Sequence, residues 1–290
     1  MTIVASLFGL SVVLIGGLLY LNRPRLVTIE ATVPESFPAK TFSHEMFESL
    51  LARYVDSQGN VDYAAWHDAR NDRLALDHYL AAVASFSPES APERFPRRSE
   101  ALAYWIYAYN ACVIRSVLEK WPLASVTDVK APIEVVKGLG FFYQQRFVFG
   151  GIDLSLYTVE HDKILDAYRD PRIHFVLNCA SASCPVLRPE LPTGDDLEVL
   201  LSIATLDFVS DPRNVRVDHE RRQVLLSSIF KWYRNDFVND LRRRGLLTAT
   251  GVLGYIREAG SMELQAELAA AEGYDVVFND YDWAINSQDY

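Results

Sequence analysis

The N-terminal segment constrains the architecture of this chain more than any other part of it. Residues 2–22 carry no charge, and as a helix the apolar residues 3–21 would span roughly 28 Å, close to the hydrocarbon thickness of a bilayer. A cleaved signal peptide is the main alternative, but its apolar region is usually shorter, follows a basic start and ends at small residues. We therefore expect an uncleaved transmembrane helix within residues 1–25, which makes the membrane a partner. A polar linker is expected over residues 26–41.

The remainder has the composition of a globular protein. Half of the 290 residues are hydrophobic and 23% are charged, which excludes a disordered or collagen-like chain. The net charge of −10 disfavours nucleic acid as a partner, because such binding depends on clustered Lys and Arg. The one basic run, Arg242, Arg243 and Arg244, is expected to lie at a solvated helix end.

Apolar residues that recur at helical spacing predict most of the secondary structure after the linker. Ser43 and Ser99 are the predicted caps of the first helix and of the longest one. The high aromatic content of the longest helix indicates that most of it is buried. The predicted helices lie at residues 44–58, 72–84, 100–120, 193–209, 252–259 and 263–272, with short ones after Thr158 and Ser228.

Apolar residues that alternate predict a smaller β component. Gly150 and Gly151 separate two alternating segments, and glycine accepts the positive φ angles of a tight hairpin turn. A second hairpin is predicted at residues 214–227, and residues 173–178 are predicted to form a buried strand. A last strand is expected at residues 274–279. The pattern is that of one α+β domain over residues 42–290, with a helix-rich half and a small antiparallel sheet.

Short stretches along this domain carry a recognisable pattern. They are residues 103–111, 160–161, 170–175, 178–181, 183–185, 227–233 and 281–283. In this order they resemble the domain of unknown function 547 family, which is found in bacteria and plants. The family name implies no activity. By analogy, the paired Cys and His residues in such an α+β chain look like the papain and transglutaminase-like architecture.

The orientation in the membrane is left open by two opposing signals. Arg23 and Arg25 follow the apolar segment, so the positive-inside rule places the domain in the cytoplasm. Members of the family often carry export signals, so the resemblance favours the far side. We expect a single-pass protein of a bacterial inner membrane on either account.

Cys179 is the strongest candidate nucleophile. It directly follows the predicted strand 173–178, and small residues come after it, which would let main-chain N–H groups converge on a developing oxyanion. An inert structural thiol is the alternative, because free Cys is among the most buried residue types.

Cys184 has three possible roles. It is a second candidate nucleophile, a disulfide partner of Cys179 in an oxidising compartment, or a metal ligand together with Cys179, His161 and His174. The metal role ranks last because the spacing of these residues matches no common zinc site. We expect no cofactor.

His161 is the predicted general base. Strand alternation would place His174 and Cys179 on opposite faces, whereas His161 falls in the first turn of a predicted helix. A helix N-terminus favours the neutral imidazole that a base requires. Glu160 would point about 100° away from His161 and be free for another role. Capping and surface positions are the alternative for this pair, and His174 is expected to be a structural residue or to share a site with Asn178.

Asn110 and Asp282 are candidates for orienting the base. A buried Asn must be hydrogen-bonded, so Asn110 either ties down a loop or orients an imidazole. Asp282 either orients a histidine or caps the final turn.

These residues together predict a membrane-anchored cysteine hydrolase or acyl transferase that acts on an amide or a thioester. Its substrate would be a small molecule or a peptide. The alternative is a non-enzymatic binding or scaffold module in which the Cys and His residues hold a loop together.

Overall fold

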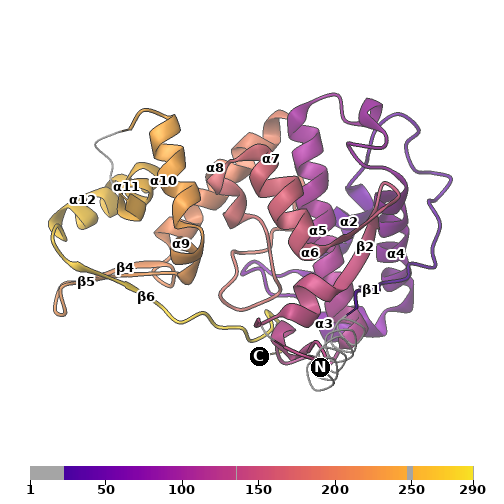
Figure 1. Cartoon of the computed structure of the whole chain (residues 1–290), viewed down its shortest axis with the longest axis horizontal. Coiled ribbons are helices and arrows are strands. Elements are labelled where there is room, and N and C mark those ends of the chain that lie inside the picture. The colour runs from indigo at the N-terminus through magenta and orange to yellow at the C-terminus, as the bar shows by residue number, and fades with distance from the viewer. Residues whose placement is uncertain (1–22, 135, 247–250, 290) are drawn as a thin grey trace, which may run out of the picture.

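The computed structural model describes residues 23–134, 136–246 and 251–289. Residues 1–22, which include the whole apolar part of the predicted transmembrane segment, lie outside these ranges. Among the helices that are described, none combines the length and the apolar character needed to cross a bilayer. The described chain is an α+β structure, as the periodicity predicted, with helices at both ends of an elongated molecule (Figure 1).

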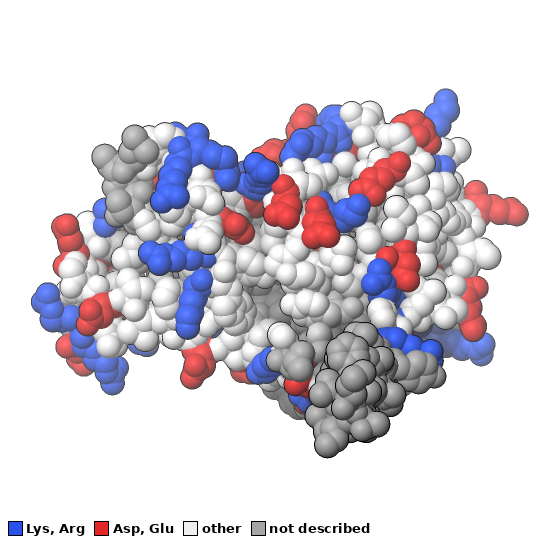
Figure 2. Space-filling model, in the orientation of Figure 1, with Lys and Arg blue, Asp and Glu red and all other residues white. Residues whose placement is uncertain are grey.

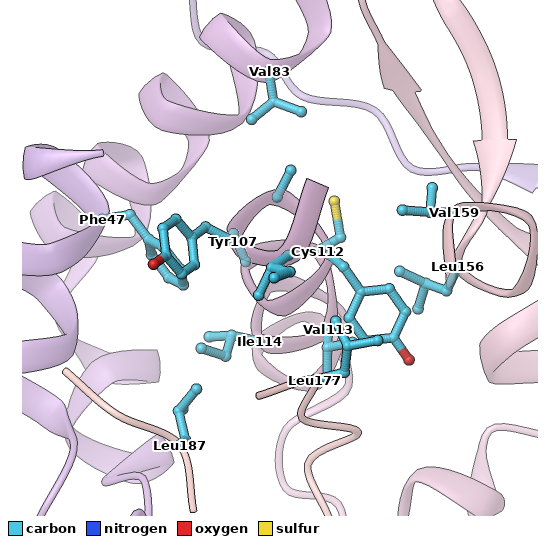
Figure 3. Packing of buried hydrophobic residues seen from close by; sticks show 14 of the residues in the cluster. Phe47, Val83, Tyr107, Cys112, Val113, Ile114, Leu156, Val159, Leu177 and Leu187 are labelled. Atoms are coloured by element: carbon cyan, nitrogen blue, oxygen red, sulfur yellow. The ribbon is translucent and has the colours of Figure 1, made fainter. Parts of the chain in front are cut away.

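The larger hydrophobic core forms around one long helix. The helices that build it are α2 (Glu45–Tyr54), α3 (Tyr63–Asp68), α4 (Arg70–Ser85) and α5 (Arg98–Lys120). Sixteen residues of α5 are buried, which confirms the prediction from its aromatic content. Figure 3 shows Tyr107, Cys112 and Val113 of α5 surrounded by side chains of other elements.

The start of α5 lies slightly earlier than the sequence suggested. Its N-cap is Arg97, not Ser99, and the Arg97 N–H donates to Glu100 Oε2 at 3.2 Å. This is the backbone half of a capping box, in which the third residue of the helix satisfies a free donor at the N-cap.

The predicted glycine hairpin is confirmed. Strands β2 (Gln145–Phe149) and β3 (Ile152–Ser155) pair antiparallel, and β1 (Arg25–Leu26) pairs parallel with β2. Gly150 and Gly151 have φ angles of 54° and 85°. Their N–H groups donate to carbonyls at the end of α4, so the turn is docked onto that helix.

A second three-stranded sheet lies in the C-terminal part. Strands β4 (Val215–Asp218) and β5 (Gln223–Leu226) form the second predicted hairpin, and β6 (Asp275–Phe278) pairs parallel with β5. Both sheets are therefore mixed, and the prediction of an antiparallel sheet is wrong in this respect. In the described part of the segment between β5 and β6 there are four helices, which is the kind of long crossover that parallel pairing requires.

A second hydrophobic cluster packs between this sheet and the later helices. These helices are α8 (Asp195–Ser210), α9 (Ser228–Trp232), α10 (Arg234–Arg243), α11 (Gly251–Ala259) and α12 (Met262–Ala270). The basic run at the end of α10 is exposed, and Asp240 contacts both Arg243 and Arg244. On the face shown in Figure 2, acidic and basic side chains are interspersed.

Residues 173–178 do not form the predicted strand. Pro171–Phe175 is a 3₁₀ helix, η5, and irregular chain follows it. The side chain of Asp170 accepts a hydrogen bond from the Arg172 N–H, and Pro171 occupies the first helical position. A short apolar run fits a strand and a buried helical turn equally well, and here the Asp-Pro start decides for the turn.

The helix that carries Glu160 and His161 is mostly a π-helix. Three consecutive segments form it: α6 (Leu156–Thr158), the π-helix η4 (Val159–Leu165) and α7 (Asp166–Tyr168). Ser155 caps its start by accepting from the Thr158 N–H at 3.1 Å. A second π-helix, η3 (Leu139–Gln144), precedes β2. Such wide turns are rare in proteins and frequent at functional sites.

After β6 the chain runs back from the C-terminal part to the larger core (Figure 1). Ile285 is buried there, and it forms an isolated bridge with Ser181. The Tyr63 hydroxyl donates to Asn286 Oδ1 at 3.1 Å. The C-terminal tail is therefore part of the larger core.

Candidate functional site

One cavity of about 540 Å³ brings together most of the predicted site residues. Glu160, His161, His174, Cys179 and Cys184 all line it. Its volume is typical of sites that bind small organic molecules. The cavity brings residues 160–161 together with residues 174–184, and the sequence alone could not place these two segments relative to each other.

Cys179 and Cys184 form a disulfide bond on the wall of this cavity. This is the second of the three roles considered for Cys184. In this state neither sulfur is a nucleophile, so thiol chemistry at the cavity requires the dithiol form. Cys112, the remaining cysteine, is free and buried, and burial raises the pKa of its thiol well above the usual value.

Several hydrogen-bond donors surround the two sulfurs. The Tyr281 hydroxyl lies 3.2 Å from each of them, and Ser181 Oγ lies 3.0 Å from Cys179 Sγ and 3.4 Å from Cys184 Sγ. The Cys179 N–H donates to Cys184 Sγ at 2.9 Å. Cys184 therefore has the greater number of donors available to stabilise a negative charge.

Most main-chain N–H groups of the loop 180–184 already have partners. The N–H groups of Ala180, Ala182, Ser183 and Cys184 are all hydrogen-bonded to other protein oxygens. Tyr281 is the alternative donor, and burial raises the pKa of its phenol, so it remains protonated.

Glu160 is held by two tyrosines that come from distant elements. Its Oε2 accepts from the Tyr109 hydroxyl at 3.1 Å, and its Oε1 accepts from the Tyr233 hydroxyl at 2.6 Å. Burial raises the pKa of both phenols, and the negative charge of Glu160 raises them further. Both tyrosines therefore remain donors, and Glu160 is not a helix-capping residue.

His161 lies against an aromatic ring on the cavity wall. Its ring centroid is 4.0 Å from that of Tyr157. The helix begins at Leu156, so His161 lies in the π-helical segment and not in the predicted first turn.

His174 is buried beside the cavity and has a carboxylate partner. Its Nε2 lies 2.9 Å from Asp236 Oδ2, and its ring stacks on Tyr233 at 3.8 Å. The argument that strand alternation separates His174 from Cys179 is wrong, because the segment between them is not a strand and both residues line the cavity.

The Asn110 side chain holds the main chain of residues 176–178, which leads into the loop that contains Cys179 and Cys184. Its Nδ2 donates to the Val176 carbonyl at 3.0 Å, and its Oδ1 accepts from the Asn178 N–H at 2.9 Å. Asn178 in turn donates to the Pro185 carbonyl at 2.9 Å. This is the loop-tying role, and Asn110 has no histidine partner among these contacts.

Asp282 lies outside the cavity and lines a different one. Its N–H donates to Ser183 Oγ, and its Oδ1 accepts from the Ala284 N–H, both at 2.9 Å. Asp282 therefore shapes the turn of the tail. Within the described ranges, no three His, Cys, Asp or Glu side chains are grouped so that they could hold a metal ion.

The aromatic walls of the cavity were not identified from the sequence. They are formed by Tyr109, Phe142, Tyr143, Tyr157, Trp232, Tyr233, Tyr281 and Trp283. Most of these residues belong to the stretches that carry the family resemblance. The presence of aromatic residues in the stretches that resemble the family was the sequence feature that could have indicated these walls. Aromatic residues by themselves more often indicate a hydrophobic core.

Residues 92–209 match the model of the family described as "Protein of unknown function, DUF547". The predicted resemblance is confirmed over these residues. The DUF547 match includes α5, Glu160, His161 and both cysteines of the disulfide. No curated protein and no solved structure matched the chain, so the papain and transglutaminase-like analogy stays a prediction.

Proposed function

We propose that the cavity is the active site of a hydrolase or acyl transferase that uses the dithiol form of Cys179 and Cys184. The observation that supports this proposal is that two sulfurs, two imidazoles and a carboxylate line one cavity of about 540 Å³. The substrate would carry an amide or a thioester, whose carbonyl carbon a thiolate attacks.

The contacts suggest a division of roles. Cys184, with more donors around its sulfur, attacks the carbonyl carbon, and the Tyr281 hydroxyl donates to the oxyanion that develops. His161 takes the thiol proton and passes it to the leaving group. Water or an acceptor nucleophile then releases the acyl group and restores the thiol. Cys179 is the partner that forms the disulfide of the oxidised state.

A membrane tether is part of the same proposal. It is supported by the absence of charge over residues 2–22 and by the arginines that follow. A reporter fused after Tyr290 measures on which side of the membrane the domain lies. Release of the full chain from membranes by high salt alone would contradict the tether.

The test of the thiol mechanism is alkylation of the reduced protein. At pH 6.5, iodoacetamide should modify Cys184 faster than it modifies glutathione, as followed by mass spectrometry. Buried Cys112 is the internal control and should remain unmodified. Rates at Cys179 and Cys184 no higher than that of glutathione would reject the proposal.

A binding or scaffold module is the second candidate, and the disulfide together with the Asn110 network favours it. In that case, replacing both cysteines by Ser should lower the melting temperature and impair any cellular role to the same degree. In the enzyme, the double variant should lose its role even at temperatures where it is fully folded.

A further inference from the structure

We propose that this cavity recognises a ligand with a cationic ammonium group, held between aromatic rings and the carboxylate of Glu160. The inference names the substrate class of the site, and in that respect it rests on the proposed function. The walls and the charge of the cavity favour such a ligand whatever the state of the two sulfurs.

Two groups of rings in mutual contact form the walls. In one, Tyr143 and Tyr157 are stacked with their ring centroids 4.3 Å apart, and the tilted ring of His161 lies 4.0 Å from Tyr157. In the other, Tyr281 lies 4.8 Å from Trp232 and 4.6 Å from Trp283. The face of an aromatic ring attracts a cation, and several rings around one space form the usual receptor for a quaternary ammonium group.

Part of this aromatic surface is exposed. Tyr143, Tyr157 and Trp232 are 36%, 37% and 49% exposed, although each of them lines the cavity. Large apolar side chains that remain accessible beside a cavity are available to a ligand.

The carboxylate of Glu160 supplies the complementary charge. It accepts hydrogen bonds from Tyr109 and Tyr233, but among the described residues no Lys or Arg forms an ion pair with it. A ligand that fills the cavity would displace water from this carboxylate. The loss of hydration costs free energy unless the ligand brings a cation next to the carboxylate. An ammonium ligand would supply that cation.

Lys137 shows that these rings attract positive charge. Its Nζ lies 5.0 Å from the ring centroid of Trp283, on the wall of the same cavity. Lys137 already occupies the surface of Trp283, so the ligand should contact Tyr143, Tyr157 and Trp232 beside Glu160.

The experiment compares two probes of the same shape. Choline and its neutral isostere 3,3-dimethylbutan-1-ol are titrated by calorimetry into the full-length protein with its disulfide intact. We expect choline to bind about 10-fold or more tightly than the isostere. Equal affinities, or no binding of choline, would overturn the proposal.

Matched variants locate the binding. Glu160→Gln should weaken choline binding about 10-fold or more, whereas Glu220→Gln, an exposed control in the β4–β5 turn, should not change it. Tyr157→Leu should weaken binding roughly 3- to 30-fold, and Tyr157→Phe, which keeps the ring, should restore it. Trp232→Leu repeats the test at an exposed position where folding is not at risk.

These measurements are independent of the thiol test. With the disulfide intact there is no thiolate, so failure of choline to bind leaves the alkylation result unaffected. Failure of the alkylation test likewise leaves an ammonium-binding cavity without thiol chemistry.

Discussion

At the scale of single residues, hydrogen-bond partners decide roles that residue type leaves open. Glu160 could have been a surface residue, but two tyrosines hold its carboxylate at the cavity. Asn110 could have oriented a histidine, but both ends of its amide bind the chain on either side of Leu177. Neither role follows from spacing along the chain.

Asn110→Leu should lower the free energy of unfolding by about 2–4 kcal/mol, because it leaves the buried Asn178 N–H and the partly buried Val176 carbonyl without partners. Urea denaturation measures the change. A variant with unaltered stability and lost activity would instead assign Asn110 to the catalytic machinery.

His44 gives a prediction for pH. It is buried, its Nδ1 lies 2.8 Å from the Tyr79 hydroxyl, and burial lowers its pKa from 6.5 to about 3. Between these values the unfolded chain binds a proton that the folded chain does not bind. His44 therefore makes stability fall by about 1.4 kcal/mol per pH unit as the pH drops below 6.5.

Replacing His44 by Asn should remove this contribution and flatten the dependence of the unfolding free energy on pH. The measurement is urea denaturation at several pH values between 4 and 7. His67→Asn, at a more exposed position, is the matched control and should keep the contribution of His44, because it leaves that buried histidine in place. An unchanged slope in His44→Asn would contradict the assignment.

At the scale of elements, local sequence signals were reliable where a single interaction determines the structure. The Gly-Gly hairpin and the long aromatic helix follow from turn chemistry and periodicity. The π-helix at Glu160 and the 3₁₀ helix at Pro171 could not be predicted in this way. The apolar pattern of so short a segment is compatible with more than one backbone conformation.

The hairpin allows two otherwise similar substitutions to be compared. A Cβ at Gly150 would lie 2.2 Å from Ser87 Oγ, whereas a Cβ at Gly151 would meet nothing within 4 Å. Both residues have positive φ, so Gly151→Ala should cost about 1–2 kcal/mol from backbone strain alone. Gly150→Ala should lower the free energy of unfolding by a larger amount. Thermal or urea denaturation of the two variants measures the difference. Equal losses would mean that Ser87 adds no steric constraint at Gly150.

At the scale of the whole molecule, the C-terminal tail joins parts of the chain that are far apart in sequence. It contributes Tyr281 and Trp283 to the cavity and Ile285 to the larger core. The geometry of the cavity therefore depends on the packing of the tail.

Ile285→Ala should lower the free energy of unfolding by about 2–4 kcal/mol, because Ile285 is almost fully buried. It should also weaken choline binding, since Tyr281 of the tail packs against Trp232, one of the rings that contact the ligand. Ile203→Ala on the exposed face of α8 is the control, with an expected change within about 0.5 kcal/mol. Similar losses in the two variants would show that the tail is not held by its buried isoleucine.

The sequence by itself determined the α+β class, most helices, both hairpins and the cysteines and histidines worth considering. These follow from periodicity, turn residues and side-chain chemistry, which are local properties. Only the tertiary structure decided that Cys179 pairs with Cys184, that Glu160 meets Tyr109 and Tyr233, and that the sheets are mixed. Those features include pairs as far apart in the chain as Arg25 and Gln145, and their contacts depend on how the whole chain packs.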